Sequence, residues 1–148
     1  MNPDYVDLLR ELIAAEVRFL IVGAYAVAFH SRPRATGDLD IWIDPTRENA
    51  ERTFKALAAF GAPLADLNVA DLTTPGIVYQ IGVAPRRIDI LTALTGLHFE
   101  SAWPDRVSGR IGDVECPFIG REALVRNKRT LSRPRDRADL ELLGEATR

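Results

Sequence analysis

The sequence is poor in cysteine and in long apolar runs. Cys116 is the single cysteine among 148 residues, so the chain can form neither an internal disulfide nor a cysteine-ligated zinc site. No apolar run approaches the roughly 20 residues that a membrane span needs. The first eleven residues already carry two aspartates, an arginine and a glutamate, which is unlike a secretory signal. We therefore expect a cytoplasmic protein without membrane partners.

The chain also has little net charge. It carries 19 basic and 21 acidic residues, a formal charge of -2, which excludes a global field that would attract nucleic acid or a membrane. The sum hides an asymmetry, because residues 1–120 hold 11 basic and 16 acidic groups and residues 121–148 hold 8 basic and 5 acidic groups. The sequence thus combines a body of net charge -5 with a C-terminal segment of net charge +3.

The length predicts one domain. A chain of this size buries about 68 to 70% of the surface that its unfolded form exposes, which suffices for one hydrophobic core. No internal repeat, low-complexity tract or linker divides the sequence. We expect residues 1–148 to form a single domain, with a core up to about residue 119 and C-terminal helices from about residue 120.

Hydrophobic periodicity and turn residues predict alternating helices and strands. Asn2 and Pro3 are a cap and a first-turn proline, and apolar residues follow them at helical spacing up to Val17. Further helices are expected at 24–30, at 45–60 before Gly61, at 121–131 and at 134–144. Strands are expected at 19–22, 38–44, 77–82, 87–91, 107–111 and 114–119, with hairpins through residues 84–85 and 112–113. This order predicts an α+β, or mixed-sheet α/β, fold with a central sheet flanked by helices and a C-terminal helical pair.

The strand at 38–44 alternates apolar and polar residues. Leu39, Ile41 and Ile43 fall on one side, and Asp38, Asp40, Trp42 and Asp44 fall on the other, so we expect one buried face. Asp38 and Asp40 then lie on one face, about 6 to 7 Å apart along the strand, where a divalent cation can bridge them. Their spacing alone is weak evidence, because about three acidic pairs at this spacing are expected by chance and the chain has three.

The surroundings of the pair strengthen this interpretation. Asp89 lies between Ile88 and Ile90 in a later strand, so its side chain points away from the apolar face and we expect it to join the same patch. Three converging carboxylates repel one another, and Mg²⁺ is the natural ion to neutralise them. Gly23 follows a buried strand and opens a helix, whose free backbone N–H groups suit a phosphate.

These segments resemble the nucleotidyltransferase superfamily that includes DNA polymerase beta. The resemblance rests on residues 22–24 (VGA), 34–41 (RATGDLDI) and 87–91 (RIDIL). Residues 126–128 (RNK) and 135–140 (RDRADL) resemble the small bacterial members related to abortive-infection and type IV toxin–antitoxin nucleotidyltransferases. The likeness extends from about residue 19 to residue 143.

The resemblance implies Mg²⁺-dependent transfer of a nucleoside monophosphate from an NTP such as ATP to an acceptor hydroxyl, with release of pyrophosphate. Mn²⁺ is the alternative metal. Asp38, Asp40 and Asp89 would be the catalytic and metal-binding residues. The residues implied in nucleotide binding are Gly23, Ala24, Arg34, Thr36 and Lys128. RNA, protein and small molecules all remain open as acceptors, and an antitoxin protein is the implied partner if the chain is a toxin.

The sequence departs from the family at Ala24, where the family has a second glycine or a serine. Ala24 keeps the backbone N–H but lacks a hydroxyl for a terminal phosphate. The alternative is therefore a weak or inactive relative that binds a nucleotide or a protein partner. A glycosyltransferase with an Asp-x-Asp motif is excluded by the short length. For Asp136 and Asp139 we expect ion pairs with nearby arginines, and Trp42 is a further candidate for lining the site.

Overall fold

The computed structural model describes residues 2–146. Its sheet contains six strands, β1 Phe19–Val22, β2 Leu39–Ile43, β3 Val78–Ile81, β4 Ile88–Leu91, β5 Val107–Ile111 and β6 Val114–Phe118. Its α-helices are α1 Pro3–Ala14, α2 Gly23–His30, α3 Arg47–Phe60, α4 Phe99–Ala102, α5 Arg121–Leu131 and α6 Pro134–Leu142. Two short 3₁₀ helices, Asp71–Thr73 and Trp103–Asp105, complete the described elements.

The sheet is mixed, with the strand order β3-β4-β2-β1-β6-β5. The pair β1–β2 is antiparallel, whereas β2–β4 and β1–β6 are parallel. The hairpins β3–β4 and β5–β6 form its two outer pairs. The two central strands, β1 and β2, consist mostly of buried apolar residues, as expected for strands that are covered on both faces.

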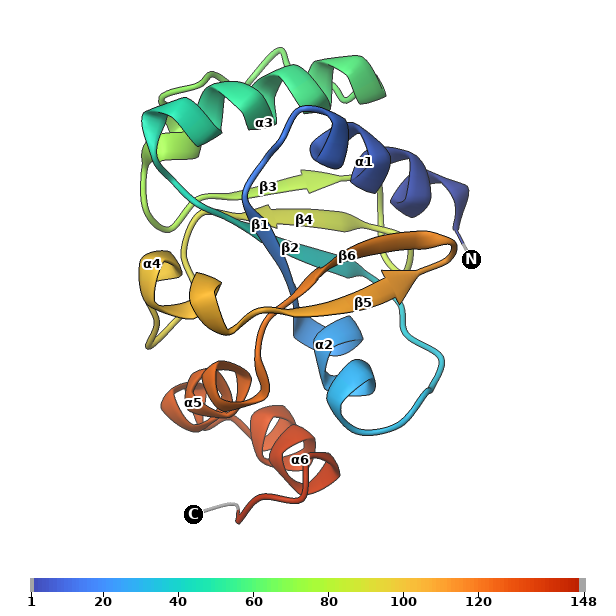
Figure 1. The fold of residues 1–148 in the computed structure, drawn as a ribbon, viewed down its shortest axis with the longest axis vertical. Helices are drawn as coiled ribbons and strands as arrows, with labels where there is room; N and C mark the ends of the chain where they lie inside the picture. The colour runs from blue at the N-terminus through green and yellow to red at the C-terminus, as the bar shows by residue number, and fades with distance from the viewer. Residues whose placement is uncertain (1, 147–148) are drawn as a thin grey trace.

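Helices cover the sheet from two sides (Figure 1). In that view α1 and α3 lie together above the sheet, and α2 lies below it, followed by the pair α5–α6 at the lower end. The core includes side chains from α1, α3 and the central strands, among them Leu8, Leu12, Ile41 and Leu57, all of them fully buried. Helices α1 and α3 thus cover one face of the sheet, and α2 and the pair α5–α6 lie on the side that carries Asp40.

Local sequence explains where the helices begin and end. The Asn2 side chain accepts a hydrogen bond from the Asp4 N–H at 2.9 Å and caps α1. Thr46 caps α3, which ends at Gly61 with φ +91°, a left-handed conformation that glycine adopts at little cost. The Asp136 carboxylate accepts from the Arg133 N–H at 3.1 Å at the start of α6, and Pro134 occupies the first turn of this helix.

The structure confirms the α+β fold with a mixed central sheet and a C-terminal helical pair. The expected single buried face of the strand at 38–44 is wrong. Trp42 is 1% exposed and Asp44 is 3% exposed, so this side is covered as well at the end of β2. The ring of Trp42 packs edge-on against Phe99 at 5.1 Å between ring centres, and Phe99 opens α4, a short helix that the sequence patterns did not predict.

None of the helices within residues 2–146 combines the length and the apolar character that crossing a membrane requires.

Candidate active site

The topology brings three of the predicted site residues to neighbouring positions. In the parallel pair β2–β4, Asp40 stands directly opposite Asp89, and in the antiparallel pair β1–β2 it stands opposite Val22. Neighbouring strands lie about 4.8 Å apart, so the two carboxylates leave adjacent points of the sheet. Asp38 lies immediately before β2, and Gly23 follows Val22 at the start of α2. Three segments distant in the sequence therefore meet at one end of the central strands.

Gly23 is in direct contact with the carboxylate of Asp40. Its φ is +66°, and a Cβ added there would lie 2.3 Å from Asp40 Oδ2 and 3.0 Å from Asp40 Cγ. A side chain at this position would therefore displace the carboxylate as well as strain the backbone. Glycine lets the first turn of α2, with its free N–H groups, approach the carboxylate cluster.

Arg87 links the two outer carboxylates. Its backbone N–H donates to Asp38 Oδ1 at 2.9 Å, and its Nε donates to Asp89 Oδ1 at 2.8 Å. The guanidinium Nη2 lies 3.4 Å from Asp38 Oδ2. The hydrogen bond with Asp89 raises the pKa of Arg87, which stays charged. This role was not predicted from the sequence, although residues 87 and 89 are two apart at the start of a strand and share a face.

The carboxylate of Asp40 forms no hydrogen bond or ion pair with another side chain within the described residues. Burial raises the pKa of Asp40 to about 6, and the charges of Asp89 and Asp38 add to the effect, against the opposing charges of Arg87 and Lys128. The repulsion between the carboxylates is thus only partly compensated. The site favours binding of a further positive charge beside Asp40.

Lys128 approaches this cluster from α5. It is 8% exposed, and its Nζ lies 3.0 Å from Asp139 Oδ2 and 3.5 Å from Asp136 Oδ1. Burial alone would raise the pKa of Asp136, but hydrogen bonds with Arg133 lower it, helped by the charge of Lys128. The expected ion pairs of Asp136 and Asp139 with basic groups are thus observed. Both aspartates come from α6, so the C-terminal helical pair fixes the position of this lysine.

The remaining predicted nucleotide-binding residues are divided between two places. Ala24 follows Gly23 in the first turn of α2. Arg34 and Thr36 instead lie in the connection from α2 to β2 and line a groove between α1 and α2. The Nη2 of Arg34 is 3.8 Å from Asp139 Oδ1, so this connection is also tied to α6.

The chemistry of the carboxylates fits a hard divalent cation. In residues 2–146 no three acidic, histidine or cysteine side chains already converge on one point as a complete metal cage. Mg²⁺ does not require such a cage, because it is usually held by one or two carboxylates together with waters and substrate phosphates. The uncompensated charge at Asp40 and the open approach left by Gly23 suit that kind of partial protein site.

Other polar candidates from the sequence lie away from the cluster or serve packing. Trp42 shares the strand face of Asp40 but is covered by α4, so it does not line the site. Cys116 is buried, as expected, and burial raises the pKa of its thiol to about 12. His30 Nε2 lies 2.7 Å from the carbonyl oxygen of Ile119 and joins α2 to the end of β6.

Comparisons with known proteins support the fold. No protein-family model matches the sequence, and no curated protein matches it. A crystal structure of a "putative nucleotidyltransferase" from Thermotoga maritima matches over 95% of this chain and 92% of that chain, with a TM-score of 0.57 and 14% identity. The chain therefore has the nucleotidyltransferase-like fold that the sequence motifs imply. At this identity the likeness concerns the fold alone.

Proposed function

We propose that the protein is a Mg²⁺-dependent nucleotidyltransferase that transfers a nucleoside monophosphate from an NTP to an acceptor hydroxyl. The observation that carries the proposal is the meeting of Asp40, Asp89 and the glycine turn of α2 at one end of the sheet. Carboxylates beside free N–H groups at a helix start are what a metal-bound triphosphate requires. The shared fold is consistent with this chemistry.

The chain's own residues have distinct roles in this proposal. The N–H groups of Gly23 and Ala24 would bind oxygens of the triphosphate, and Lys128 would neutralise part of its charge. Asp40 would hold Mg²⁺ directly, and Asp38 and Asp89, which Arg87 bonds in the free protein, would complete the metal site when the triphosphate binds. When bound, Mg²⁺ would supply charge neutralisation on the triphosphate and activation of the acceptor hydroxyl.

The reaction is a single displacement at the α-phosphorus. The acceptor oxygen forms a bond to that phosphorus, and the bond to the bridging oxygen of the β-phosphate breaks, so pyrophosphate leaves with that electron pair. The proton of the acceptor hydroxyl goes to a carboxylate of the cluster, for which Asp89 is our assignment. Positioning and charge neutralisation supply most of the rate enhancement in such transfers.

A labelling experiment tests this function. The protein is incubated with Mg²⁺, each NTP labelled at the α-phosphate, and either total RNA or total protein from cells. We expect label in an acceptor, and a loss of about 100-fold or more in Asp40→Asn and Asp89→Asn, because these changes remove charge from the reacting centre. Asp66→Asn, at an exposed loop residue, is the control. Transfer that survives in both site variants would refute the assignment.

The alternative function is nucleotide binding without transfer. Ala24 favours it, because a serine there would offer a hydroxyl to the terminal phosphate and alanine offers none. The two functions differ in one result. Tight binding of Mg²⁺–NTP with no label in any acceptor would favour the binding protein.

We also propose that the protein acts in the cytoplasm as the toxin of a toxin–antitoxin pair. The sequence resemblance in residues 126–128 and 135–140 supports this role, and both segments lie in the C-terminal helical pair that fixes Lys128. Induced expression should then arrest growth, and Asp40→Asn should abolish the arrest. Equal arrest by both forms would contradict the proposed role, as would normal growth with the active enzyme.

A further inference from the structure

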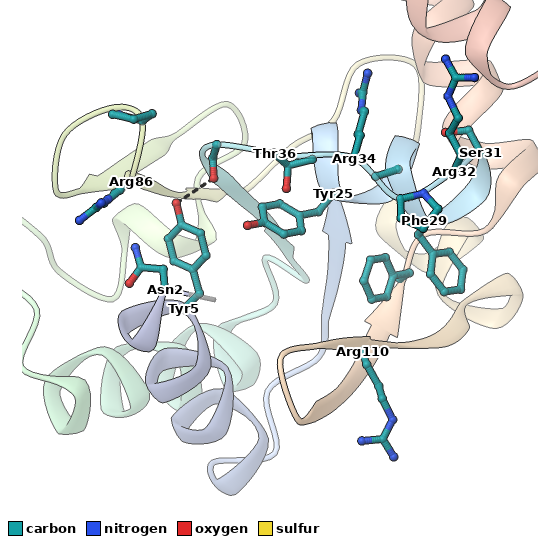
Figure 2. Close-up of a pocket in the computed structure, with 15 residues that line it drawn as sticks. Asn2, Tyr5, Tyr25, Phe29, Ser31, Arg32, Arg34, Thr36, Arg86 and Arg110 are labelled. Atoms are coloured by element: carbon teal, nitrogen blue, oxygen red, sulfur yellow. Dashed lines mark hydrogen bonds between the residues drawn. The ribbon is translucent and has the colours of Figure 1, made fainter.

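A groove lies beside the carboxylate cluster, between α1, α2 and the connection that follows α2 (Figure 2). Its volume is about 770 Å³. Residues of the β3–β4 turn and of β5 and β6 complete its walls, so segments from most of the chain contribute to it. We call it the arginine groove, after its lining residues Arg32, Arg34, Arg86 and Arg110.

The groove is positively charged. Four arginines line it, and none of the other lining residues is acidic. Arg32 and Arg86 are exposed, and neither forms an ion pair within residues 2–146. Their charges are thus available to an anionic ligand, whereas the side chain of Arg34 is partly engaged with Asp139.

Four aromatic rings also line the groove, and the Arg110 side chain points away from them (Figure 2). Tyr5 and Phe118 are buried, so Phe29 is the most exposed of the four rings. Tyr5 and Tyr25 meet edge to face, with 6.0 Å between ring centres. Phe29 stacks on Phe118 at 4.5 Å, yet it remains 40% exposed, which is unusual for so large an apolar side chain. A Cβ at Gly109 would lie 2.7 Å from the Phe29 ring, so glycine makes room for this stacked pair. The groove therefore combines one accessible ring, Phe29, with two exposed arginines that form no ion pair within residues 2–146.

The groove leads to the catalytic carboxylates. The hydroxyl of Tyr5 donates to the carbonyl oxygen of Gly37 at 2.9 Å, and Gly37 immediately precedes Asp38 (Figure 2). Arg86 immediately precedes Arg87, which bonds to both Asp38 and Asp89. One end of the groove is thus lined by the residues that directly precede Asp38 and Arg87.

We propose that the arginine groove binds the single-stranded end of a nucleic acid acceptor. Guanidinium groups that bind phosphates, together with an exposed aromatic face on which a base can stack, are features by which proteins bind such strands. An acidic peptide would pair with the groove arginines but would not explain the exposed ring of Phe29. The acceptor role rests on the proposed nucleotidyl transfer, whereas the binding itself does not.

Binding is measured by fluorescence anisotropy with a labelled 12-nucleotide RNA of mixed sequence, without NTP and in EDTA. We expect Arg32→Ala/Arg86→Ala to weaken binding by about tenfold or more and to lower the slope of log affinity against log salt by about 1.4, since each neutralised phosphate contributes about 0.7. Phe29→Leu keeps an apolar side chain against Phe118, and should weaken binding about fivefold or more without changing this slope.

A matched control removes equal charge elsewhere. Arg47→Ala/Arg52→Ala changes α3, which contributes no residue to the groove, and should bind RNA like the unchanged protein. Equal weakening by both double variants would overturn the proposal, as would equally tight binding of duplex RNA or displacement of the RNA by polyglutamate. Asp40→Asn should bind normally but transfer no label. If RNA binds in the groove but no label is transferred, only the proposed function is refuted. If the groove variants transfer label as well as the unchanged protein, only the proposal that the groove binds the acceptor is refuted.

Discussion

At the scale of single residues, the site is built around a carboxylate whose charge is poorly compensated. Asp40 lies between Gly23 and Asp89, whereas Arg87 bonds to Asp38 and Asp89. The arginine neutralises the outer pair and leaves the central carboxylate dependent on a ligand. This arrangement costs stability in the free protein, and a cation bound as we propose would relieve the cost.

Replacing Asp40 should therefore stabilise the protein in a pH-dependent way. The pKa of Asp40 is raised to about 6 in the folded state, so the fold binds this proton more tightly than the unfolded chain does. Stability from this group is full below about pH 4 and is lost as pH rises through about 6. In EDTA, Asp40→Asn should raise the free energy of unfolding by about 1 to 3 kcal/mol at pH 8 and by about zero at pH 4.

Urea unfolding at the two pH values measures this difference. Asp66→Asn, at an exposed loop residue, should change the free energy of unfolding little at either pH. Destabilisation by Asp40→Asn at pH 8 would show that the carboxylate is compensated in the free protein.

Gly23→Ala should separate a backbone effect from a site effect. Gly61 also has positive φ, +91°, but a Cβ there would meet nothing within 4 Å, so Gly61→Ala is the matched control. Both changes should cost about 1 to 2 kcal/mol through left-handed strain. Gly23→Ala must in addition displace Asp40, and nucleotide binding should fall about tenfold or more in this variant alone. Equal binding by the two variants would contradict the close approach.

At the scale of elements, one buried polar side chain of α3, Asn49, forms hydrogen bonds with residues at the ends of the central strands. Asn49 donates to the carbonyl oxygens of Asp44 at 2.8 Å and Arg18 at 3.0 Å, and it accepts from the Arg18 N–H at 2.7 Å. These bonds connect the helix to the end of β2 and to the residue before β1. The central strands that carry Asp40 and Gly23 are thereby held in register from the face opposite the site.

Asn49→Ala should destabilise the protein by about 2 to 3 kcal/mol, because it leaves buried backbone groups without partners. Lys55→Ala, on the exposed face of the same helix, should change the free energy of unfolding by less than about 0.5 kcal/mol. Thermal or urea unfolding checks both values. A similar effect of the two substitutions would show that Asn49 does not join the helix to the sheet.

Most elements were predictable because their boundaries depend on local chemistry. Residues 19–22 form the predicted strand because four apolar residues end at Gly23, and α3 ends where Gly61 was expected to stop it. The burial of Trp42 was not predictable from alternation, because the covering ring of Phe99 comes from a distant four-residue helix. Likewise, spacing placed Asp89 on the correct face, but its position opposite Asp40 depends on strand order, which is set by the whole chain.

At the scale of the whole molecule, part of the basic charge of the C-terminal segment is paired within the segment itself. Arg121 and Arg129 pair with Glu145, and Lys128 and Arg133 pair with Asp136. The net charge of this segment already counts these pairs, and Arg126, Arg135 and Arg137 are exposed and form no ion pair within residues 2–146. The exposed arginines of the groove come instead from residues 1–120, whose net charge is -5. They lie in segments that are far apart in the sequence, and only the folded structure brings them to one groove.

Calorimetric titration with a non-hydrolysable NTP measures whether the carboxylate cluster binds a metal-bound nucleotide. We expect binding in Mg²⁺ that is lost in EDTA and weakened about tenfold or more in Asp40→Asn and Asp89→Asn, with Asp66→Asn unchanged. Absence of binding would contradict the account, and so would equal affinity in the unchanged protein and both site variants.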